Sequence, residues 1–110
     1  MGQHRDTLHG TLELLVLRTL DGAGAKHGTD ISDHIAQLSG EVLRVEEGSL
    51  YPALHRMEEA GWVRSQWKAS DNNRRARYYA ITASGRRRLA QIKHRWTAHV
   101  DAVLRVLRPA

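Results

Sequence analysis

The sequence predicts a mainly helical α+β fold, in which three short helices precede a two- or three-stranded sheet and one long final helix. Apolar residues recur at helical spacing in four segments, and two short alternating runs flank a polar, basic loop after the third segment. A chain of 110 residues fits one compact unit, whose small core would gain from pairing with a second copy.

The first helix is expected over residues 7–23, where apolar residues recur at three- and four-residue spacing. Thr7 or Thr11 can cap its start, and Gly22 or Gly24 can end it, because glycine accepts the left-handed conformation of a helix terminus. The expected buried stripe comprises Leu8, Leu12, Leu15, Val16 and Leu20.

A second, shorter helix is expected over residues 28–39, with Thr29 or Asp30 as its cap and Gly40 as its end. Its predicted core face comprises Ile31, Ile35 and Leu38. Residues 41–45 are too few for a helix, and their valines and leucine suit a short strand that could pair with the later hairpin.

The third helix is expected over residues 48–60 and ends at Gly61. Pro52 should lie in its first turn, where the missing N–H costs least. The predicted core side comprises Leu50, Leu54 and Met57, and the opposite side Ser49, Tyr51, His55, Arg56 and Glu59. This opposite side could reach base edges and phosphates, or it could be an ordinary solvated helix face.

Two short strands follow, at 62–67 and 77–82. Alternation places Val63 and Trp67 on one side of the first strand, while Tyr79 and Ile81 face inward from the second. The polar loop and its flank carry Asn72, Asn73, Arg74, Arg75 and Arg77. Two strands alone would be unstable, so the helices should form the layer beneath them.

The final helix can start at a Thr82 or Ser84 cap and run to about Leu107, before Pro109. Such a helix would extend beyond a small domain. Its apolar seam therefore predicts packing against a second copy, as a homodimer. The predicted dimerisation residues are Leu89, Ile92, Trp96, His99, Val100, Val103 and Leu107.

Basic residues gather in the second half of the chain, although the net charge is only +5. Residues 62–95 hold ten of the 17 Lys and Arg and one of the 12 acidic residues, whereas residues 1–61 hold five basic and ten acidic side chains. A field of one sign attracts a polyanion, so nucleic acid is the favoured partner and an anionic membrane surface the competitor. A plainer interpretation is that Arg86, Arg87 and Arg88 only make a helix start soluble.

Other classes of function lack their usual signals. The chain has no cysteine and nothing that resembles a signal peptide or a membrane span, so we expect a cytoplasmic protein without membrane association. Seven histidines do not predict a metal site, because pairs such as His27 with His34 and His94 with His99 lack i, i+4 spacing. Neither a phosphate loop nor a nucleophile elbow is present, so we expect no enzyme and no cofactor.

The order of elements is that of a winged helix-turn-helix, in which the third helix enters the major groove of double-stranded DNA and the basic hairpin, the wing, follows the backbone or minor groove. We expect residues 1–82 to form the DNA-binding domain and residues 83–110 the dimerisation helix. The predicted DNA-binding residues are Ser49, Tyr51, Pro52, His55, Arg56, Asn73, Arg74, Arg75 and Arg77. The alternative is a protein-interaction module whose basic face binds an acidic partner.

Four segments resemble the PadR family of bacterial transcriptional regulators. They are GTLELLVLRTL at 10–20, the HG and DI pairs within 27–31, EEGSLYPALHRMEEAGW at 46–62 and NNRRARYYAIT at 72–82. The resemblance implies an N-terminal winged helix, dimerisation through the C-terminal helix and repression by operator binding. It also implies DNA contacts at the start of the recognition helix, here Ser49, Tyr51 and Pro52, alongside the arginines of the wing.

The chain ends soon after one helix, so it resembles the short class of the family, without a large C-terminal domain. The resemblance further implies that some relatives respond to small phenolic or planar aromatic effectors near the dimer interface. Trp96 is the residue here that could contact such an effector. The alternative is that Trp96 is a large interface residue, because aromatic side chains are common in interfaces.

Overall fold

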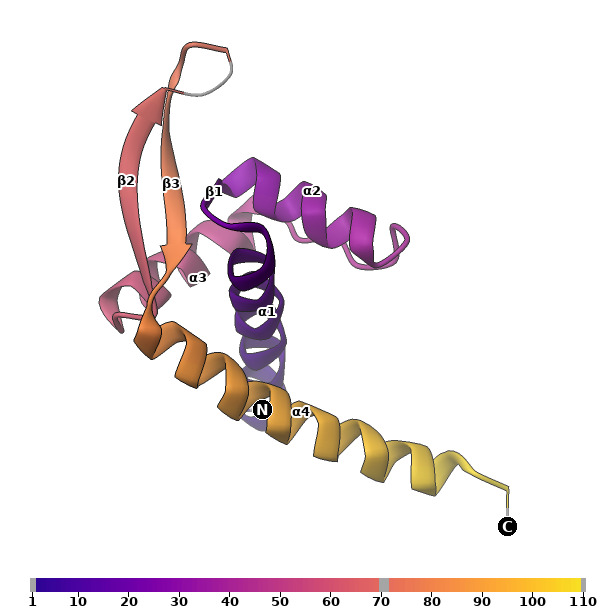
Figure 1. Ribbon diagram of the computed structural model, residues 1–110. Helices are drawn as coiled ribbons and strands as arrows, with labels where there is room; N and C mark the ends of the chain where they lie inside the picture. Colours follow the sequence, from indigo (N-terminus) through magenta and orange to yellow (C-terminus); the bar gives the residue numbers. More distant parts are fainter. Residues whose placement is uncertain (1, 70–71, 110) are drawn as a thin grey trace.

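The computed structural model describes residues 2–69 and 72–109, which form four helices and one three-stranded antiparallel sheet. The elements are α1 (Gly2–Ala23), β1 (Lys26–His27), α2 (Gly28–Leu38), α3 (Glu47–Glu59), β2 (Val63–Ala69), β3 (Arg75–Ile81) and α4 (Ala83–Leu107). Helices α1 to α3 gather at the centre, β2 and β3 rise beside them as a long hairpin, and α4 passes below (Figure 1). The predicted mainly helical α+β fold, with a wing and a long final helix, is confirmed.

The core lies where all four helices meet the lower part of the sheet. Its buried apolar side chains are Val16, Leu17 and Leu20 of α1, Ile31 and Ile35 of α2, Leu50, Ala53, Leu54 and Met57 of α3, Val63, Tyr79 and Ile81 of the sheet, and Leu89 and Ile92 of α4. The predicted core faces of α3 and of β3 are therefore confirmed. Leu38 differs from the prediction, because it lies at the last turn of α2 and is 73% exposed.

Helix α1 begins at Gly2 rather than at residue 7. The side chains of residues 2–10, among them Leu8 and the predicted Thr7 cap, lie outside the described part of the structure. The helix ends at the predicted glycine: Gly24 has a left-handed φ of 82°, and its amide donates to a carbonyl one turn back at 3.2 Å. This conformation costs glycine little because it has no Cβ.

The third strand of the sheet is β1, and it pairs antiparallel with β3, so that Lys26 lies opposite Tyr79 and His27 opposite Tyr78. On its other side β3 pairs with β2, with Val63 opposite Ile81 and Trp67 opposite Arg77. The strand order is thus β1-β3-β2. Because β1 directly precedes α2, the sheet is joined by hydrogen bonds to the start of that helix.

The strand predicted at residues 41–45 is wrong. The chain reverses there through two successive left-handed residues, Gly40 and Glu41, with φ of 63° and 68°. The hydroxyl of Ser39 then accepts a hydrogen bond from the amide of Leu43 at 2.9 Å. This side-chain bond takes a donor that a strand ladder would need, so the segment forms a turn and an irregular loop instead.

The cap of α2 is His27, not the predicted Thr29 or Asp30. Its Nδ1 accepts a hydrogen bond from the Asp30 amide at 3.3 Å, and its Nε2 lies 3.1 Å from Asp30 Oδ2. Nδ1 thus acts as an acceptor, and Nε2 faces the carboxylate of the same residue. The ring also packs edge-on against Tyr78, with 5.3 Å between centroids, so the cap is fixed by the sheet.

Helix α3 begins at Glu47, one residue before its predicted start, and this moves Pro52 out of the first turn. Pro52 lies in the second turn, and its ring nitrogen cannot donate to the carbonyl of Gly48. The helix tolerates this because the affected carbonyl belongs to its exposed first turn, where water can replace the missing donor. The predicted placement of Pro52 is therefore corrected.

Helix α4 is fixed at its start to the turn between α3 and β2. The Thr82 hydroxyl accepts from the Gly85 amide at 3.0 Å and donates to the Gly61 carbonyl at 2.6 Å, so Thr82 rather than Ser84 is the cap. A Cβ at Gly85 would lie 2.0 Å from the carbonyl oxygen of Trp62, so only glycine fits. The first turn of α4 therefore lies directly on the backbone that ends α3.

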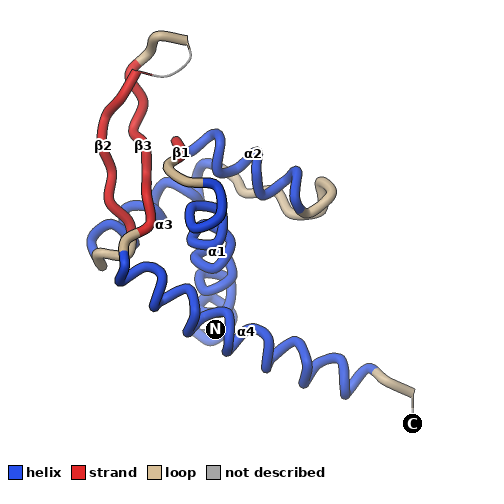
Figure 2. The backbone as a smooth tube through the Cα atoms, in the orientation of Figure 1, coloured by secondary structure: helices blue, strands red, loops and turns tan. Residues whose placement is uncertain are grey.

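Beyond Ile92, α4 projects past the other elements, and the chain consequently measures 58 × 28 × 27 Å (Figure 2). Two ion pairs fix the earlier turns of α4 to α1: Arg86 with Asp21 at 3.0 Å and Arg88 with Glu13 at 3.3 Å. Among the described residues, no helix combines the length and the apolar character needed to cross a bilayer.

Candidate nucleic-acid interface

A groove of about 870 Å³ lies between α3 and the inner face of the β2–β3 hairpin, which we call the wing. We call this space the wing groove. Its principal side chains are Tyr51 and His55 of α3, and Trp67, Arg74, Arg75 and Arg77 of the wing. Five of the predicted DNA-binding residues, Tyr51, His55, Arg74, Arg75 and Arg77, therefore line one concave surface.

Tyr51 lies where α3 meets the start of α2. Its ring is 45% exposed, and it rests against the backbone of Gly28: a Cβ at that position would lie 2.7 Å from Tyr51 Cε1 and 2.8 Å from its hydroxyl. The absence of a side chain at Gly28 therefore leaves room for the ring in this orientation. The close contact restricts the ring on one side and leaves its other side open to the wing groove.

Arg75 opens β3 and is exposed, on the same face of the wing as Trp67. Its guanidinium lies over the Trp67 ring, 5.7 Å from the ring centroid, within the range of a cation–π contact. Arg74 is also exposed and lines the groove. Asn73 lies outside the lining, at the turn, where its φ of 58° is left-handed.

Arg77 has a partner within its own chain. Its Nη2 lies 3.0 Å from Oε1 of Glu58 on α3, and its Nε donates to the Ser65 hydroxyl at 2.8 Å. Ser65 in turn donates to the other oxygen of Glu58. These bonds join the base of the wing to α3, so Arg77 has a structural role that the sequence did not reveal, and any phosphate contact would compete with Glu58.

Tyr79 lies below this network, buried on the inner face of β3. Burial raises the pKa of its phenol, because the charged phenolate would lose hydration, while the guanidinium of Arg77 opposes that shift. The Arg77 guanidinium lies 5.9 Å from the Tyr79 ring centroid. The floor of the groove is therefore a neutral aromatic surface beneath a cation.

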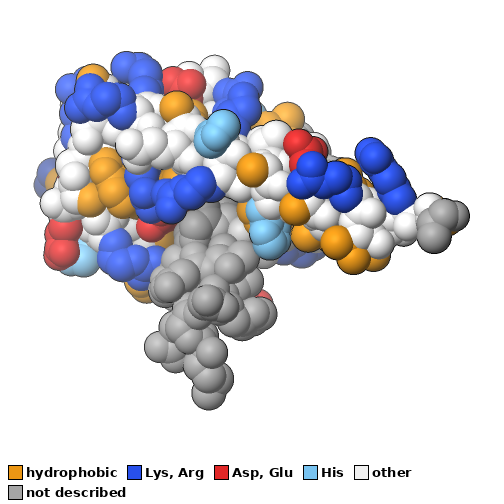
Figure 3. Space-filling model, turned by 90° about the horizontal axis from the view of Figure 1, so that it is seen from below, with side chains coloured by type: hydrophobic (Ala, Val, Ile, Leu, Met, Phe, Trp, Pro, Cys, Tyr) orange, Lys and Arg blue, Asp and Glu red, His pale blue; other side chains and the backbone are white. Residues whose placement is uncertain are grey.

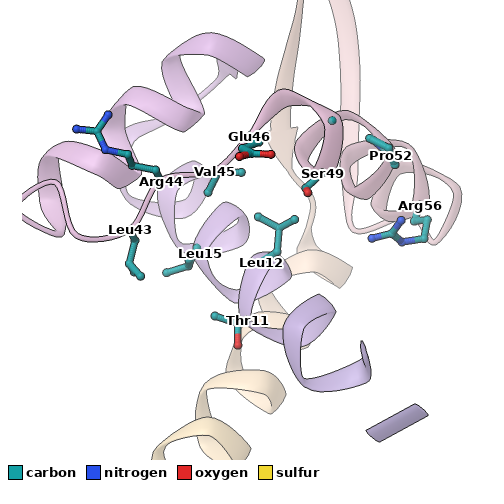
Figure 4. A pocket seen from close by; sticks show the side chains of 11 residues that line it. Thr11, Leu12, Leu15, Leu43, Arg44, Val45, Glu46, Ser49, Pro52 and Arg56 are labelled. Atoms are coloured by element: carbon teal, nitrogen blue, oxygen red, sulfur yellow. The ribbon is translucent and has the colours of Figure 1, made fainter. Parts of the chain in front are cut away.

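The remaining predicted residues of α3, Ser49, Pro52 and Arg56, lie on its other flank. They line a second cleft of about 580 Å³, together with Leu12 and Leu15 of α1 and residues of the α2–α3 loop. Figure 4 shows these side chains gathered around that cleft. The structure thus divides the predicted DNA-binding set between two flanks of α3, and only one flank faces the wing.

His55 forms an exposed contact with Glu59, with 2.7 Å between Nε2 and Oε1, one helical turn away on α3. On the surface of α3 this pair lies between the flank that faces the wing groove and the flank that faces the second cleft. It adds an imidazole and a carboxylate to the exposed side of the helix. In the described part of the chain, no group of three His, Cys, Asp or Glu side chains could hold a metal ion.

The predicted dimer seam on α4 needs a correction at its start. Leu89 and Ile92 are 7% and 6% exposed and belong to the core of their own chain, because this part of α4 packs on α1. The exposed large apolar residues of α4 begin at Trp96, which stacks on His99 with 5.9 Å between ring centroids. They comprise Trp96, Val103, Leu104, Val106 and Leu107, and Figure 3 shows apolar side chains along the projecting end of the molecule.

Two contributors to the wing groove were not predicted as site residues. The alternation of β2 predicted that Trp67 lies on the same face as buried Val63, and the structure confirms that placement. Trp67 is nevertheless 56% exposed, because the helices cover only the base of the wing. In the sequence, Gly28 is only a helix start and part of the HG pair that resembles the family. Its role depends on the ring of Tyr51, which lies in a different helix.

Known proteins resemble this chain over most of its length. A curated protein of Lysinibacillus sphaericus, called uncharacterized protein X, is 23% identical over 91 residues, which is 83% of each chain. A transcriptional regulator of Clostridium thermocellum is similar in structure, with a TM-score of 0.82 and 25% identity over 94% of this chain and 99% of that one. A padr family transcriptional regulator of Eggerthella lenta gives a TM-score of 0.77 and 26% identity, covering 99% and 93%.

The model of the transcriptional regulator PadR-like family matches residues 16–91. This range runs from the core of α1 through the wing to the buried part of α4, so it includes every element around the wing groove. Family and fold are those of DNA-binding transcriptional regulators rather than of enzymes. The chain belongs to the PadR-like family of transcriptional regulators.

Proposed function

We propose that this protein is a homodimeric repressor that binds a palindromic DNA operator in the cytoplasm. In each protomer α3 enters the major groove, and the wing follows the adjacent backbone or minor groove. The observation that carries the proposal is the convergence of Tyr51 and Arg75 on the wing groove, which lets one duplex contact both. Tyr51 presents a ring and a hydroxyl to base edges, and Arg75 presents a cation to phosphates.

The homodimer in this proposal forms through the exposed apolar residues of α4 that begin at Trp96. Three of them, Trp96, Val103 and Leu107, fall with the half-buried Val100 at three- and four-residue spacing, which suits helix-on-helix packing. A two-fold dimer would carry two α3 helices, and an operator with half-sites about one DNA turn, roughly 34–36 Å, apart would fit both. Trp96 is assigned to the interface.

The proposal divides the binding energy between two kinds of contact. The arginines of the wing neutralise phosphates, which gives affinity and salt dependence without reading the sequence. The exposed side of α3 reads base edges, which gives preference for one operator. Of the three predicted wing arginines, Arg77 contributes mainly by joining the wing to Glu58, and Arg74 and Arg75 are available to the backbone.

The test selects bound duplexes from a random pool and then measures affinity by fluorescence anisotropy on a selected and a scrambled duplex. Replacing Arg74 and Arg75 by glutamate should weaken binding to both duplexes, whereas Tyr51→Ala should weaken mainly the selected one. Lys93→Glu, an exposed charge reversal on α4, is the matched control. A wild-type protein that binds every duplex equally would contradict the proposal and favour a protein-interaction module.

A further inference from the structure

Trp67 has the exposure of a contact residue rather than of a core residue. Its ring is 56% exposed on the inner face of the wing, and it lines the wing groove together with Tyr51. An indole is the largest apolar side chain, and leaving it in water is unfavourable unless a partner covers it. Apolar side chains elsewhere on this face, Val63 and Ile81, are already covered by the helices.

The position of Trp67 along the wing also favours a contact. The wing touches α3 at Ser65, whose hydroxyl bonds to Glu58, and Trp67 is the next inward-facing residue toward the tip. At about 3.3 Å per residue it lies about 7 Å beyond that contact. It is therefore the first inner side chain of β2, counted from the base of the wing, that α3 does not cover. A ligand bound in the groove would lie beside it.

The charges around Trp67 indicate the chemistry of that ligand. Arg75 lies over the ring, and Arg74 lines the same groove. Two acidic side chains line the groove: Glu58 is paired with Arg77, and Asp30 contacts His27 at the start of α2. Among the described residues no carboxylate pairs with Arg74 or Arg75, so the exposed ring lies beside two guanidinium groups, which suits a ligand with both an anionic and an apolar part and disfavours a purely apolar protein surface.

We propose that Trp67 packs against the deoxyribose of a DNA strand that runs through the wing groove, and that it holds Arg75 toward an adjacent phosphate. This inference rests on the proposed function and adds a residue to it. The sugar is the apolar part of the backbone, whereas base faces in a duplex are stacked and would have to be separated before an indole could reach them. A cation held over a ring reaches its phosphate with less loss of side-chain freedom.

The test compares Trp67→Ala, Trp67→Phe and the control Gln66→Ala, which changes the exposed neighbour on the outer face of β2. Sugars carry no sequence information, so Trp67→Ala should weaken binding to a selected and to a scrambled duplex by the same factor, about tenfold. Trp67→Phe should lose about threefold. The salt slope should stay unchanged in Trp67→Ala and fall by about one in Arg75→Gln.

Coupling between the two side chains gives a second readout. If Trp67 holds Arg75, the double variant Trp67→Ala/Arg75→Gln should lose less affinity than the product of the two single losses. In a Trp62→Phe/Trp96→Phe background, first shown by light scattering and anisotropy to keep the mass and affinity of the wild type, Trp67 is the sole indole, and duplex should shield its fluorescence from acrylamide. Thermal unfolding shows which variants keep the fold.

The outcomes separate this inference from the proposed function. Wild-type protein that prefers its selected duplex, with Trp67→Ala binding as tightly as wild type, would overturn the inference and leave the proposed function standing. A loss confined to the selected duplex would also overturn it, because it would assign Trp67 to base reading. Wild-type protein that prefers no duplex would remove the proposed function itself.

Discussion

The ring of Tyr51 lies directly against the backbone of Gly28, so that a Cβ at position 28 would lie 2.7 Å from Tyr51 Cε1. This contact joins the first residue of α2 to the exposed side of α3. The orientation of the ring is therefore set by the absence of a side chain in another helix. Any substitution at Gly28 must displace the ring or separate the two helices.

Gly28→Ala should accordingly weaken sequence-specific binding more than binding to a scrambled duplex, because it displaces Tyr51 without changing the charge of the wing. The free energy of unfolding should fall by no more than about 1 kcal/mol, because the half-exposed end of the Tyr51 side chain can turn away. Anisotropy on both duplexes and urea unfolding measure the two effects. Gly48→Ala is the control for stability, since no atom lies within 4 Å of a Cβ there, and an equal loss in it would argue against the steric explanation.

Glu58→Gln should release Arg77 from its ion pair and remove a negative charge from the wing groove. Affinity for a scrambled duplex should rise and its salt slope should steepen by about one, because Arg77 becomes available to a phosphate. Both partners are partly exposed, so the stability change should stay below about 1 kcal/mol. The matched control is Glu59→Gln, whose carboxylate pairs with His55 instead. A variant that binds scrambled DNA more weakly would contradict this role.

Stability should fall at alkaline pH through Tyr79. Its pKa is raised in the folded protein by burial, so the folded state holds the proton more tightly than the unfolded chain does. The resulting stability is fully present below the ordinary tyrosine pKa of about 10 and is lost as the pH rises through the folded value. Urea unfolding at increasing pH should show this loss, and Tyr79→Phe should reduce it. Tyr78→Phe, on the other face of the same strand, is the control.

Val103→Asp should separate the proposed dimer, because it places a charge within the exposed apolar stripe of α4. Light scattering after gel filtration should give a mass near twice 12.4 kDa for the wild type and near 12.4 kDa for the variant. Arg105→Gln is the control, since Arg105 points away from this stripe on the helix. A monomeric wild type at micromolar concentration would contradict the dimer.

The spacing of apolar residues along helices and strands predicted the parts of the fold that depend on local pattern. The buried faces of α3 and β3 were correct because Leu50, Leu54 and Met57, or Tyr79 and Ile81, repeat at the period of one element. The two-residue strand β1 was missed because Lys26 and His27 are too short a run to show alternation. Its existence depends on hydrogen bonds to β3, far along the chain.

The candidate site was predicted in part, since residue type indicates chemistry but not partners. Arg75 was expected on the wing and lines the groove. The role of Arg77 depends on Glu58, 19 positions away, which no local pattern connects to it. Along α4 the apolar residues are buried in the core at first and exposed beyond Trp96. The spacing of Leu89 and Ile92 does not reveal where burial gives way to exposure.

Because α4 is fixed to the end of α3, a movement of the final helix is transmitted to α3. Thr82 and Gly85 fasten its first turn to the backbone of Gly61 and Trp62 without an intervening linker. A helix of 25 residues is about 37 Å long, so a tilt of about 5° at its far end corresponds to a displacement of about 3 Å. In the proposed dimer, a small rotation between the two final helices would alter the distance between the two copies of α3.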